Sequence, residues 1–431
     1  MSEPAAVLEP DPAGARGTLP RLLTGVRADG GPLSLDLHLR LHGSLAMVSR
    51  AGLIELVAAS GLRGRGGAAF PTARKLEAVA AGRGRPVVVA NGTEGEPASD
   101  KDKALLRWVP HLVLDGVSLA AAAVGAAEAI VVIGEGSRNE RAVMEQALAE
   151  RDARAPDRDV RISLAAAPDR FVAGEETALI NFLNGGPAKP LFVPPRPFER
   201  GVGGAPTLVQ NVETLAHLAL IARYGAEWFR ELGSDDEPGS ALVTLSGGVR
   251  RPGVYEVGLG TAFRDIVVGA GGLSEPARAL LVGGYFGGWI EARSALELSL
   301  LDADLAPHGI GLGARAVAVL PQGACGVVET ARVARYLANE SAGQCGPCVN
   351  GLDAIATSLE RIAAGRADRS PEQILRWTSQ VLGRGACKHP DGAVRFVESG
   401  LQVFSREFEL HGHGRRCSGD GRTVLPVEVS R

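Results

Sequence analysis

Short apolar runs alternate with helix-length segments through the first half of the chain. Val87–Ala90, Ala129–Ile133 and Val160–Leu164 have the length and composition of strands, whereas Arg141–Arg151 and Glu175–Leu183 are predicted to be helices. Strands that alternate with helices are typical of βαβ units. The pattern therefore predicts an α/β domain with a mostly parallel sheet that helices cover.

A polar segment, SDDEPGS at 234–240, interrupts this alternation. The sequence that follows predicts a hairpin around Arg250–Gly253, a helix at Ala262–Val268 and strands at Ala279–Val282 and Ala316–Val319. Short elements in this order indicate a small β-grasp-like domain.

From Thr330 onward the apolar spacing becomes helical. A capping box at 370–373 places a proline at the first helical position, and Asp391 is a candidate cap for a last helix that reaches about Leu410. We expect a bundle of about four helices. The predicted segments are a flexible arm at 1–45, the α/β domain at 46–233, the β-grasp-like domain at 234–325, the bundle at 326–410 and a polar tail at 411–431.

The composition is that of an ordinary globular protein, with 45% hydrophobic residues and a net charge of −3 among 431 residues. This balance implies no nucleic-acid partner. Leu112–Ile133 is apolar but carries acidic residues, so it predicts a buried helix and strand rather than a membrane span. The first residues lack the features of a secretory signal. We expect a cytoplasmic protein without direct membrane insertion, which is compatible with a place in a membrane-associated complex.

Five cysteines are too few for a disulfide scaffold in a chain of this size. Cys345 and Cys348 form a CxxC, which in a reducing compartment indicates a metal or redox site. Lysine is also rare, because only five of the 46 basic residues are lysines. A lysine in this chain therefore indicates a position that needs a compact ammonium group.

Three polar segments are candidates for ligand binding. GLRGRGGAAFPTARK (61–75) is rich in glycine and ends at Lys75, so its backbone N–H groups could approach an anion. Gly64, Gly66 and Ala69 satisfy GxGxxA, but the residues before them look helical, which weakens a dinucleotide fingerprint. A flexible glycine loop is the alternative.

The second segment, NGTEGEPASDKDK (91–103), follows a predicted strand directly, where ligands bind in open α/β sheets. A solvated charged loop is the alternative. The third, at 171–190, opens a helix with Glu175 and Glu176, and one of the two carboxylates suffices to complement the helix dipole. PTLVQNVETL (206–215) offers further polar groups before another helix, or is an ordinary helix entry.

Taken in order, these motifs resemble the NADH-binding flavoprotein subunit of respiratory complex I and the matching subunits of bidirectional hydrogenases and NAD-linked formate dehydrogenases. The resemblance rests on GLRGRGGAAFPTARK, NGTEGEPASDKDK, AGEETAL, PTLVQNVETL, SGGVRRPGVYEVGLGT, ESAGQCGPC and GACKHP. It implies a Rossmann-like FMN domain, a β-grasp-like SLBB domain and a C-terminal four-helix bundle that holds a [4Fe–4S] cluster.

The resemblance also implies residue roles. Glu94 and Glu175 would be the catalytic carboxylates. The residues that would bind FMN or NADH are Gly64, Gly66, Phe70, Lys75, Asn91, Glu94, Phe171, Gly174, Glu175, Glu176, Gln210, Asn211 and Thr214.

The sequence departs from the family in the donor pocket. Aromatic residues that follow the family's lysine are replaced by Leu76, Glu77 and Ala78, and another aromatic position is Gly203. Because base stacking on an aromatic side chain contributes about 1–3 kcal/mol, these replacements weaken NADH binding.

The cluster motif departs as well, because the first cysteine of the family's ESCGQCTPC is Ala342. Cys345, Cys348 and Cys387 remain. A four-iron cluster normally has four thiolates, so the fourth ligand would come from His389, Cys325 or solvent. The alternatives are a [3Fe–4S] cluster, a zinc ion held by three cysteines and a histidine, or cysteines that only pack.

The predicted function is electron transfer: FMN takes electrons from NADH or another donor, and an iron–sulfur centre passes them to a partner subunit or a ferredoxin-like protein. The alternative is a non-catalytic docking or regulatory paralogue whose NADH and cluster sites have degenerated.

Overall fold

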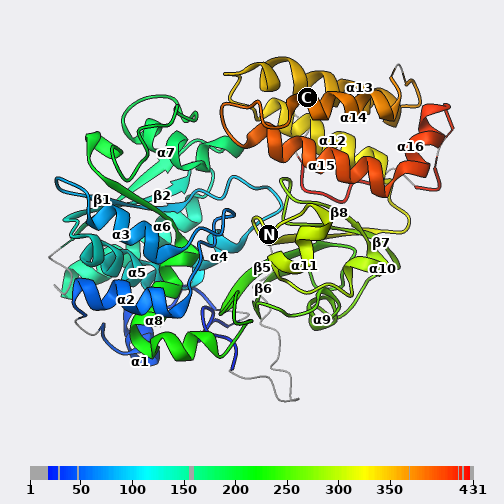
Figure 1. Ribbon diagram of the computed structural model, residues 1–431. Helices are drawn as coiled ribbons and strands as arrows, with labels where there is room; N and C mark the ends of the chain where they lie inside the picture. Colours follow the sequence, from blue (N-terminus) through cyan, green and yellow to red (C-terminus); the bar gives the residue numbers. More distant parts are fainter. Residues whose placement is uncertain are drawn as a thin grey trace. The chain divides into compact units, whose positions relative to one another are not determined.

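The computed structural model describes residues 18–27, 30–45, 48–154, 160–367, 369–415, 417–419 and 422–427 (Figure 1). The chain forms two compact units. The first unit comprises Met1–Gly95, Asp100–Val243 and Gly253–Thr261, and the second comprises Glu96–Ser99, Thr244–Pro252 and Ala262–Arg431.

The first unit is built on a parallel sheet with the strand order β3-β2-β1-β4. The chain adds β2 and β3 on one side of β1 and then places β4 on the other side. The strand order thus reverses between β1 and β4, and such a reversal leaves a crevice at the carboxyl ends of the strands. The strands are β1 (Val87–Gly92), β2 (Glu128–Gly134), β3 (Arg161–Ala167) and β4 (Thr207–Asn211).

Helices pack on both faces of this sheet because the side chains of a strand alternate in direction. Val88 and Ala90 belong to the large core that includes α5 and α8, whereas Val87 and Val89 belong to a smaller cluster with α7. The helices are α1 (Leu35–His42), α2 (Arg50–Ser60), α3 (Thr72–Ala80), α4 (Lys101–Trp108), α5 (Pro110–Val124), α6 (Arg138–Arg154), α7 (Glu176–Leu183) and α8 (Val212–Arg230).

The second unit begins with a sheet in the order β5-β9-β7-β8, in which β5 pairs with β9 in parallel and the other pairs are antiparallel. Its strands are β5 (Ser240–Gly247), β7 (Ala277–Val282), β8 (Gly288–Glu291) and β9 (Ala316–Pro321). The second unit contains β5 only from Thr244 onward, and β6 (Gly253–Gly258) belongs to the first unit. The short helices α9 (Phe263–Gly269), α10 (Ala292–Ala295) and α11 (Asp302–Leu305) accompany it.

The C-terminal part of the second unit is helical, as predicted (Figure 1). α12 packs on α13 and α15, and α14 packs on α15, which makes the expected bundle of four. The predicted last helix is divided at Phe404. The helices are α12 (Gly326–Asn339), α13 (Asp353–Ala363), α14 (Pro371–Val381), α15 (His389–Val403) and α16 (Ser405–Gly412).

The segment at 1–45 differs from the flexible arm that we expected. Its residues 1–17 lie outside the described residues, but Leu22 and Leu23 are fully buried and α1 forms within it. The buried carboxylate of Glu256 accepts hydrogen bonds from the backbone N–H groups of Arg21, Leu22 and Leu23. This long-range partner holds the segment in place, and the local sequence of the arm does not reveal it.

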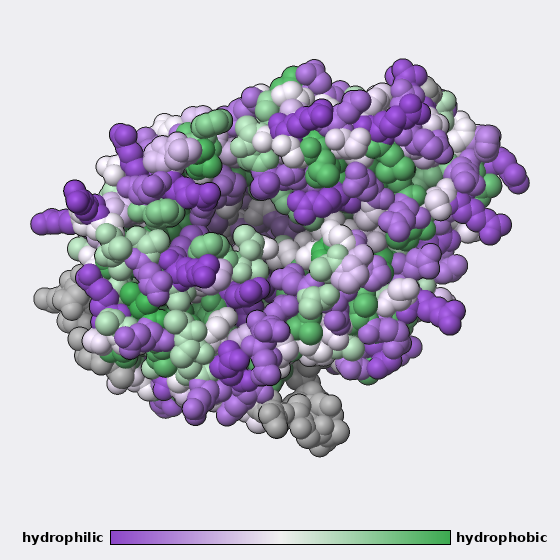
Figure 2. Space-filling view, viewed as in Figure 1, coloured by the Kyte–Doolittle hydropathy of each residue, from purple (hydrophilic) through white to green (hydrophobic). Residues whose placement is uncertain are grey.

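The tail also differs from expectation, because Leu425 is buried and the carboxylate of Glu329 accepts from the backbone N–H groups of Val424 and Leu425. Within the described ranges no single helix is long and apolar enough to cross a membrane, and only α4 and α5 pass that test together, although they are bent by 99°. On the face in Figure 2, hydrophilic side chains are spread widely and apolar ones gather in small groups.

Candidate flavin and iron–sulfur sites

The glycine-rich loop 61–75 connects two helices. α2 ends at Gly61, whose φ of 72° is a left-handed conformation that glycine adopts readily. The loop then turns back on itself, since the N–H of Gly64 donates to the carbonyl of Phe70 at 2.9 Å, and α3 begins at Thr72. Because no strand precedes the loop, GxGxxA here is not a dinucleotide fingerprint of the Rossmann type.

The tip of this loop lies against the start of α8. The backbone N–H of Arg65 donates to the buried hydroxyl of Thr214 at 2.8 Å. A Cβ at Gly66 would lie 3.1 Å from the Cβ of Asn211, so the backbone passes Asn211 at a distance that suits glycine. The first and last of the predicted FMN-binding segments are therefore in contact.

Two asparagines face each other at the carboxyl edge of the sheet. Asn91 at the end of β1 is paired in register with Asn211 at the end of β4. The side-chain amide of Asn91 donates to the carbonyl of Gly174 at 2.8 Å, and the amide of Asn211 donates to the carboxylate of Asp102 at 2.6 Å. Four separate segments thus meet where the strand order reverses.

Lys75 joins the glycine loop to two of these segments. Its ammonium group donates to the carboxylate of Glu176 at 2.8 Å and to the carbonyl of Val209 at 2.9 Å. Glu175 has another task, because its carboxylate accepts from the N–H groups of Thr177 and Ala178 and caps α7. One glutamate caps the helix and the other pairs with the lysine.

Glu94 is also a helix cap. Its two carboxylate oxygens accept from the N–H groups of Asp102 and Lys103 at 3.0 and 2.9 Å, at the start of α4. The structure therefore gives capping roles to both glutamates that we predicted to be catalytic, and their catalytic role stays a prediction. Phe70 is half-exposed, and Phe171 lies in the turn that leads to Gly174.

Sequence reasoning missed a buried charged cluster behind this edge. The ammonium group of Lys101 contacts Asp102 at 2.7 Å and Glu213 at 2.9 Å, and all three side chains are at most 7% exposed. Burial alone would lower the pKa of Lys101, but the carboxylates of Asp102, Glu213 and Glu94 outweigh it and raise the pKa. The rarity of lysine was the signal that could have placed Lys101 here.

Gln210 is the residue at this edge whose buried amide a ligand could satisfy. Its side chain is 6% exposed, yet its amide nitrogen has no hydrogen-bond partner in the protein. An unsatisfied buried donor costs about 1–3 kcal/mol, so native proteins rarely retain one without a purpose. A polar ligand such as a flavin, rich in ring carbonyls and phosphate oxygens, would supply the acceptor, and the site residues fit FMN in this respect.

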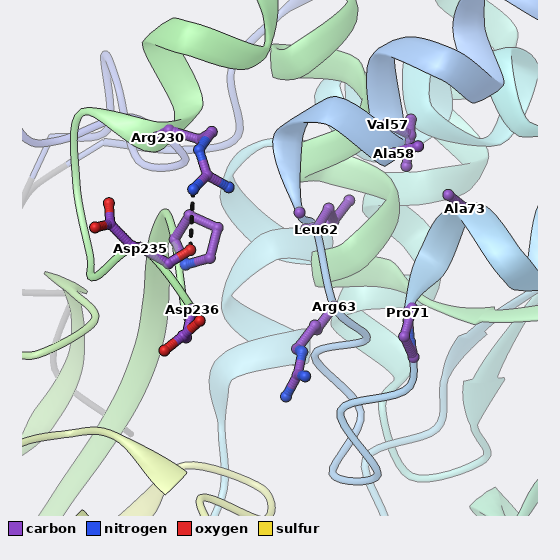
Figure 3. A pocket seen from close by; sticks show the side chains of 11 residues that line it. Val57, Ala58, Leu62, Arg63, Pro71, Ala73, Arg230, Asp235 and Asp236 are labelled. Atoms are coloured by element: carbon purple, nitrogen blue, oxygen red, sulfur yellow. Dashed lines mark hydrogen bonds between the residues drawn. The ribbon is translucent and has the colours of Figure 1, made fainter. Parts of the chain in front are cut away.

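A separate pocket of about 210 Å³ is lined in part by residues of this loop (Figure 3). Arg63 and Pro71 line one side, and Arg230 and Asp235 line the other, with Arg230 donating to the carbonyl of Asp235. This volume is below the range of roughly 300–1,000 Å³ that is usual for ligand sites. None of the predicted flavin residues lines it.

The CxxC loop lies where α12 gives way to the short π-helix Pro347–Leu352. Burial, and then the neighbouring thiols of Cys345 and Cys387, raise the pKa of Cys348 to about 12. The fold thus brings these cysteines together across the bundle. Ala342, at the position of the missing cysteine, is also buried and lies three residues before Cys345.

The two protein candidates for the fourth ligand differ in their surroundings. His389 is buried, and its Nε2 lies 2.7 Å from the carbonyl of Leu337, to which it donates, so Nδ1 is the nitrogen that could bind a metal. Cys325 lies beside His411 and Cys417 instead. The identity of the fourth ligand stays a prediction.

Comparisons with known proteins agree with this architecture. Residues 57–220 match the family model for the Nuo51 FMN-binding domain, 242–284 match the SLBB domain, and 329–411 match the NADH-ubiquinone oxidoreductase-F iron-sulfur binding region. An NADH-quinone oxidoreductase subunit of Rhizobium meliloti (strain 1021) is 34% identical over 409 residues, which cover 92% of this chain and 96% of the relative. The chain belongs to the family of NADH-binding flavoprotein subunits of NADH-quinone oxidoreductase.

Other relatives support the same assignment. The matching NADH-quinone oxidoreductase subunit of Mycobacterium tuberculosis (strain ATCC 25618 / H37Rv) is 34% identical over 397 residues, which cover 87% of this chain and 88% of the relative. A crystal structure of an NAD+-reducing [NiFe]-hydrogenase in the air-oxidized state matches with a TM-score of 0.76 and 31% identity, over 87% of this chain and 64% of the hydrogenase chain. This member of the family is thus an oxidoreductase flavoprotein with an FMN-binding domain and an iron–sulfur binding region.

Proposed function

We propose that this flavoprotein takes electrons from NADH at FMN and delivers them, through an iron–sulfur centre on the helical bundle, to a partner subunit. The observation that carries the proposal is the convergence of polar segments on the crevice between β1 and β4, with the amide of Gln210 left without an acceptor. FMN supplies the chemistry that joins a hydride donor to one-electron acceptors.

The residues at the crevice have distinct tasks in this proposal. The amide of Gln210 donates to an oxygen of FMN. Gly64 and Gly66 let the backbone approach the cofactor, and the charge of Lys75 stabilises its anionic groups. Glu176 holds the lysine in place, since its carboxylate is the partner of that ammonium group. Asn91 orients the backbone at Gly174 by its hydrogen bond.

NADH is the proposed electron donor, but this chain lacks aromatic side chains at positions where the family stacks them on the adenine. Leu76 belongs to the core and Glu77 is exposed, so neither presents a ring. Gly203 has open space where a Cβ would point. We therefore expect a higher KM for NADH than in relatives that retain the aromatic residues.

For the iron–sulfur centre we propose three thiolate ligands, Cys345, Cys348 and Cys387. The fourth ligand is His389 or solvent, or is not needed if the cluster is [3Fe–4S]. Less thiolate charge raises the reduction potential relative to a cluster with four cysteines. The electron acceptor is a partner subunit or a ferredoxin-like protein, and we place the protein in the cytoplasm.

Anaerobic purification followed by an NADH titration tests the function. We expect flavin absorption bands together with a broad iron–sulfur band, and bleaching of the flavin bands when NADH is added. Purified protein that binds FMN but is not reduced by NADH would refute the proposed donor. Protein that binds neither FMN nor iron would refute the proposal as a whole.

A further inference from the structure

A second group of potential metal ligands lies in the C-terminal part of the second unit, apart from the CxxC loop in sequence. The sulfurs of Cys325 and Cys417 are 3.3 Å apart, and the Nε2 of His411 is 3.7 Å from the sulfur of Cys325. Among the described residues, this is the group in which three ligand atoms all lie within 4.8 Å of one another. Neither cysteine is part of a disulfide.

The sulfur–nitrogen distance matches a mononuclear tetrahedral site, and the sulfur–sulfur distance is about half an ångström shorter than such a site requires. Zinc bonds of about 2.3 Å to sulfur and about 2.0–2.1 Å to nitrogen place two sulfurs about 3.8 Å apart and a sulfur and a nitrogen about 3.6 Å apart. A disulfide would instead bring the sulfurs of Cys325 and Cys417 to about 2.05 Å. Among the common divalent ions, zinc is the one that a set of two thiolates and an imidazole in tetrahedral geometry favours.

The histidine is oriented as a ligand. The Nδ1 of His411 lies 3.1 Å from the carbonyl of Ala363, to which it donates, while the backbone N–H of Cys417 donates to Nε2 at 3.4 Å. Nε2 is therefore the accepting nitrogen, and a bound metal would take the place of this hydrogen bond. Metal-binding histidines almost always donate their other ring N–H to a carbonyl or carboxylate, as His411 does.

The surroundings also suit thiolates. Cys325 is the residue before α12, so the positive end of this 14-residue helix faces it, and the N–H groups of Val328 and Val327 point to its sulfur. The N–H of Gly419 donates to the sulfur of Cys417 at 3.4 Å.

We propose that Cys325, His411 and Cys417 bind a zinc ion that fastens the C-terminal segment to the start of α12, with water as the fourth ligand. Binding releases the two thiol protons, and the charges of two thiolates and Zn²⁺ then cancel at a site where Cys325 is buried. Gly419 allows the segment to pass, because a Cβ there would lie 2.8 Å from the Cβ of Cys325.

Metal analysis of the whole purified protein tests this proposal, and iron serves as the internal reference. We expect about one zinc ion per chain beside the iron. Cys417→Ser should lose the zinc and keep the iron, whereas Cys348→Ser should lose iron and keep the zinc. This opposite pattern separates the zinc site from the proposed electron-transfer function.

Two further variants keep the test decisive if Cys417→Ser does not fold. His411→Ala should lose the zinc, whereas His413→Ala, an exposed histidine two residues away, should retain it. Alkylation of Cys325 and Cys417 should be slow in the zinc-loaded protein and become faster after chelation. Wild-type protein without zinc, zinc that survives both His411→Ala and Cys417→Ser, or a disulfide between Cys325 and Cys417 in the isolated protein would each overturn the proposal.

Discussion

Gln210→Met changes stability and flavin affinity in opposite directions if Gln210 faces FMN. The two side chains have similar length, and methionine has no donor. In the FMN-free protein the variant removes a buried amide nitrogen that has no partner, so the free energy of unfolding should rise by about 1 kcal/mol, the lower end of the cost of such a group. In the complex, an oxygen of FMN loses its donor, which costs about 1–3 kcal/mol and weakens binding by about 5- to 150-fold.

Thr214→Val is the matched control at the same edge. The hydroxyl of Thr214 is buried and accepts a hydrogen bond from the N–H of Arg65. The substitution leaves that N–H without an acceptor, so it should destabilise the FMN-free protein by about 1–3 kcal/mol. Urea unfolding of FMN-free protein and quenching of FMN fluorescence measure the two quantities. If Gln210→Met destabilises the FMN-free protein, or leaves FMN affinity unchanged, the assignment of this amide to the cofactor is wrong.

The remaining predictions concern charge, pH and the cluster. Lys75→Arg should weaken FMN binding by about tenfold although the charge is kept, because a guanidinium cannot occupy the place of a compact ammonium. The control is Lys189→Arg at an exposed site, which should leave the FMN affinity in a fluorescence titration unchanged. Burial, and then neighbouring positive groups, lower the pKa of His42 and His111 to about 4. Between about pH 6.5 and 4 the unfolded chain therefore binds more protons than the folded chain. The free energy of unfolding, measured with urea, should fall as the pH is lowered through this window. A flat profile would contradict the burial of these rings as neutral groups. Ala342→Cys should lower the reduction potential of the cluster in an EPR-monitored titration, and an unchanged potential would mean that the new thiolate does not bind iron.

The strands of the first sheet differ in how readily the sequence reveals them. β1, β2 and β3 were predictable because each is an isolated apolar run, and each appears within a few residues of its predicted bounds. β4 was missed, since Thr207–Asn211 has five residues and continues without a loop into α8, so the whole stretch has the pattern of a helix entry. That strand creates the reversal of strand order, and the crevice could not be derived without it.

The roles of individual carboxylates were harder to predict from the sequence than their positions. The pattern around Glu175 and Glu176 correctly suggested that one of them caps a helix. Glu94 offered no such signal, because it caps α4 from eight residues upstream of Asp102. Cys417 lies in the segment that we predicted to be a polar tail, and its partner Cys325 lies 92 residues earlier in the chain. Contacts of this range follow from the tertiary fold and leave no local pattern.

The direct junction of β4 and α8 limits how this protein can vary. Asn211 ends the strand and Val212 begins the helix, so no residue separates the two elements. An insertion of a single residue at the junction would rotate α8 by about 100° about its axis. The face of α8 that packs on α5 would then turn away from it. This packing is close, because a Cβ added at Gly116 of α5 would clash with the backbone of Leu215 of α8. Insertions should therefore be excluded at this junction, which borders the proposed FMN site, and length variation among related chains should occur in loops instead.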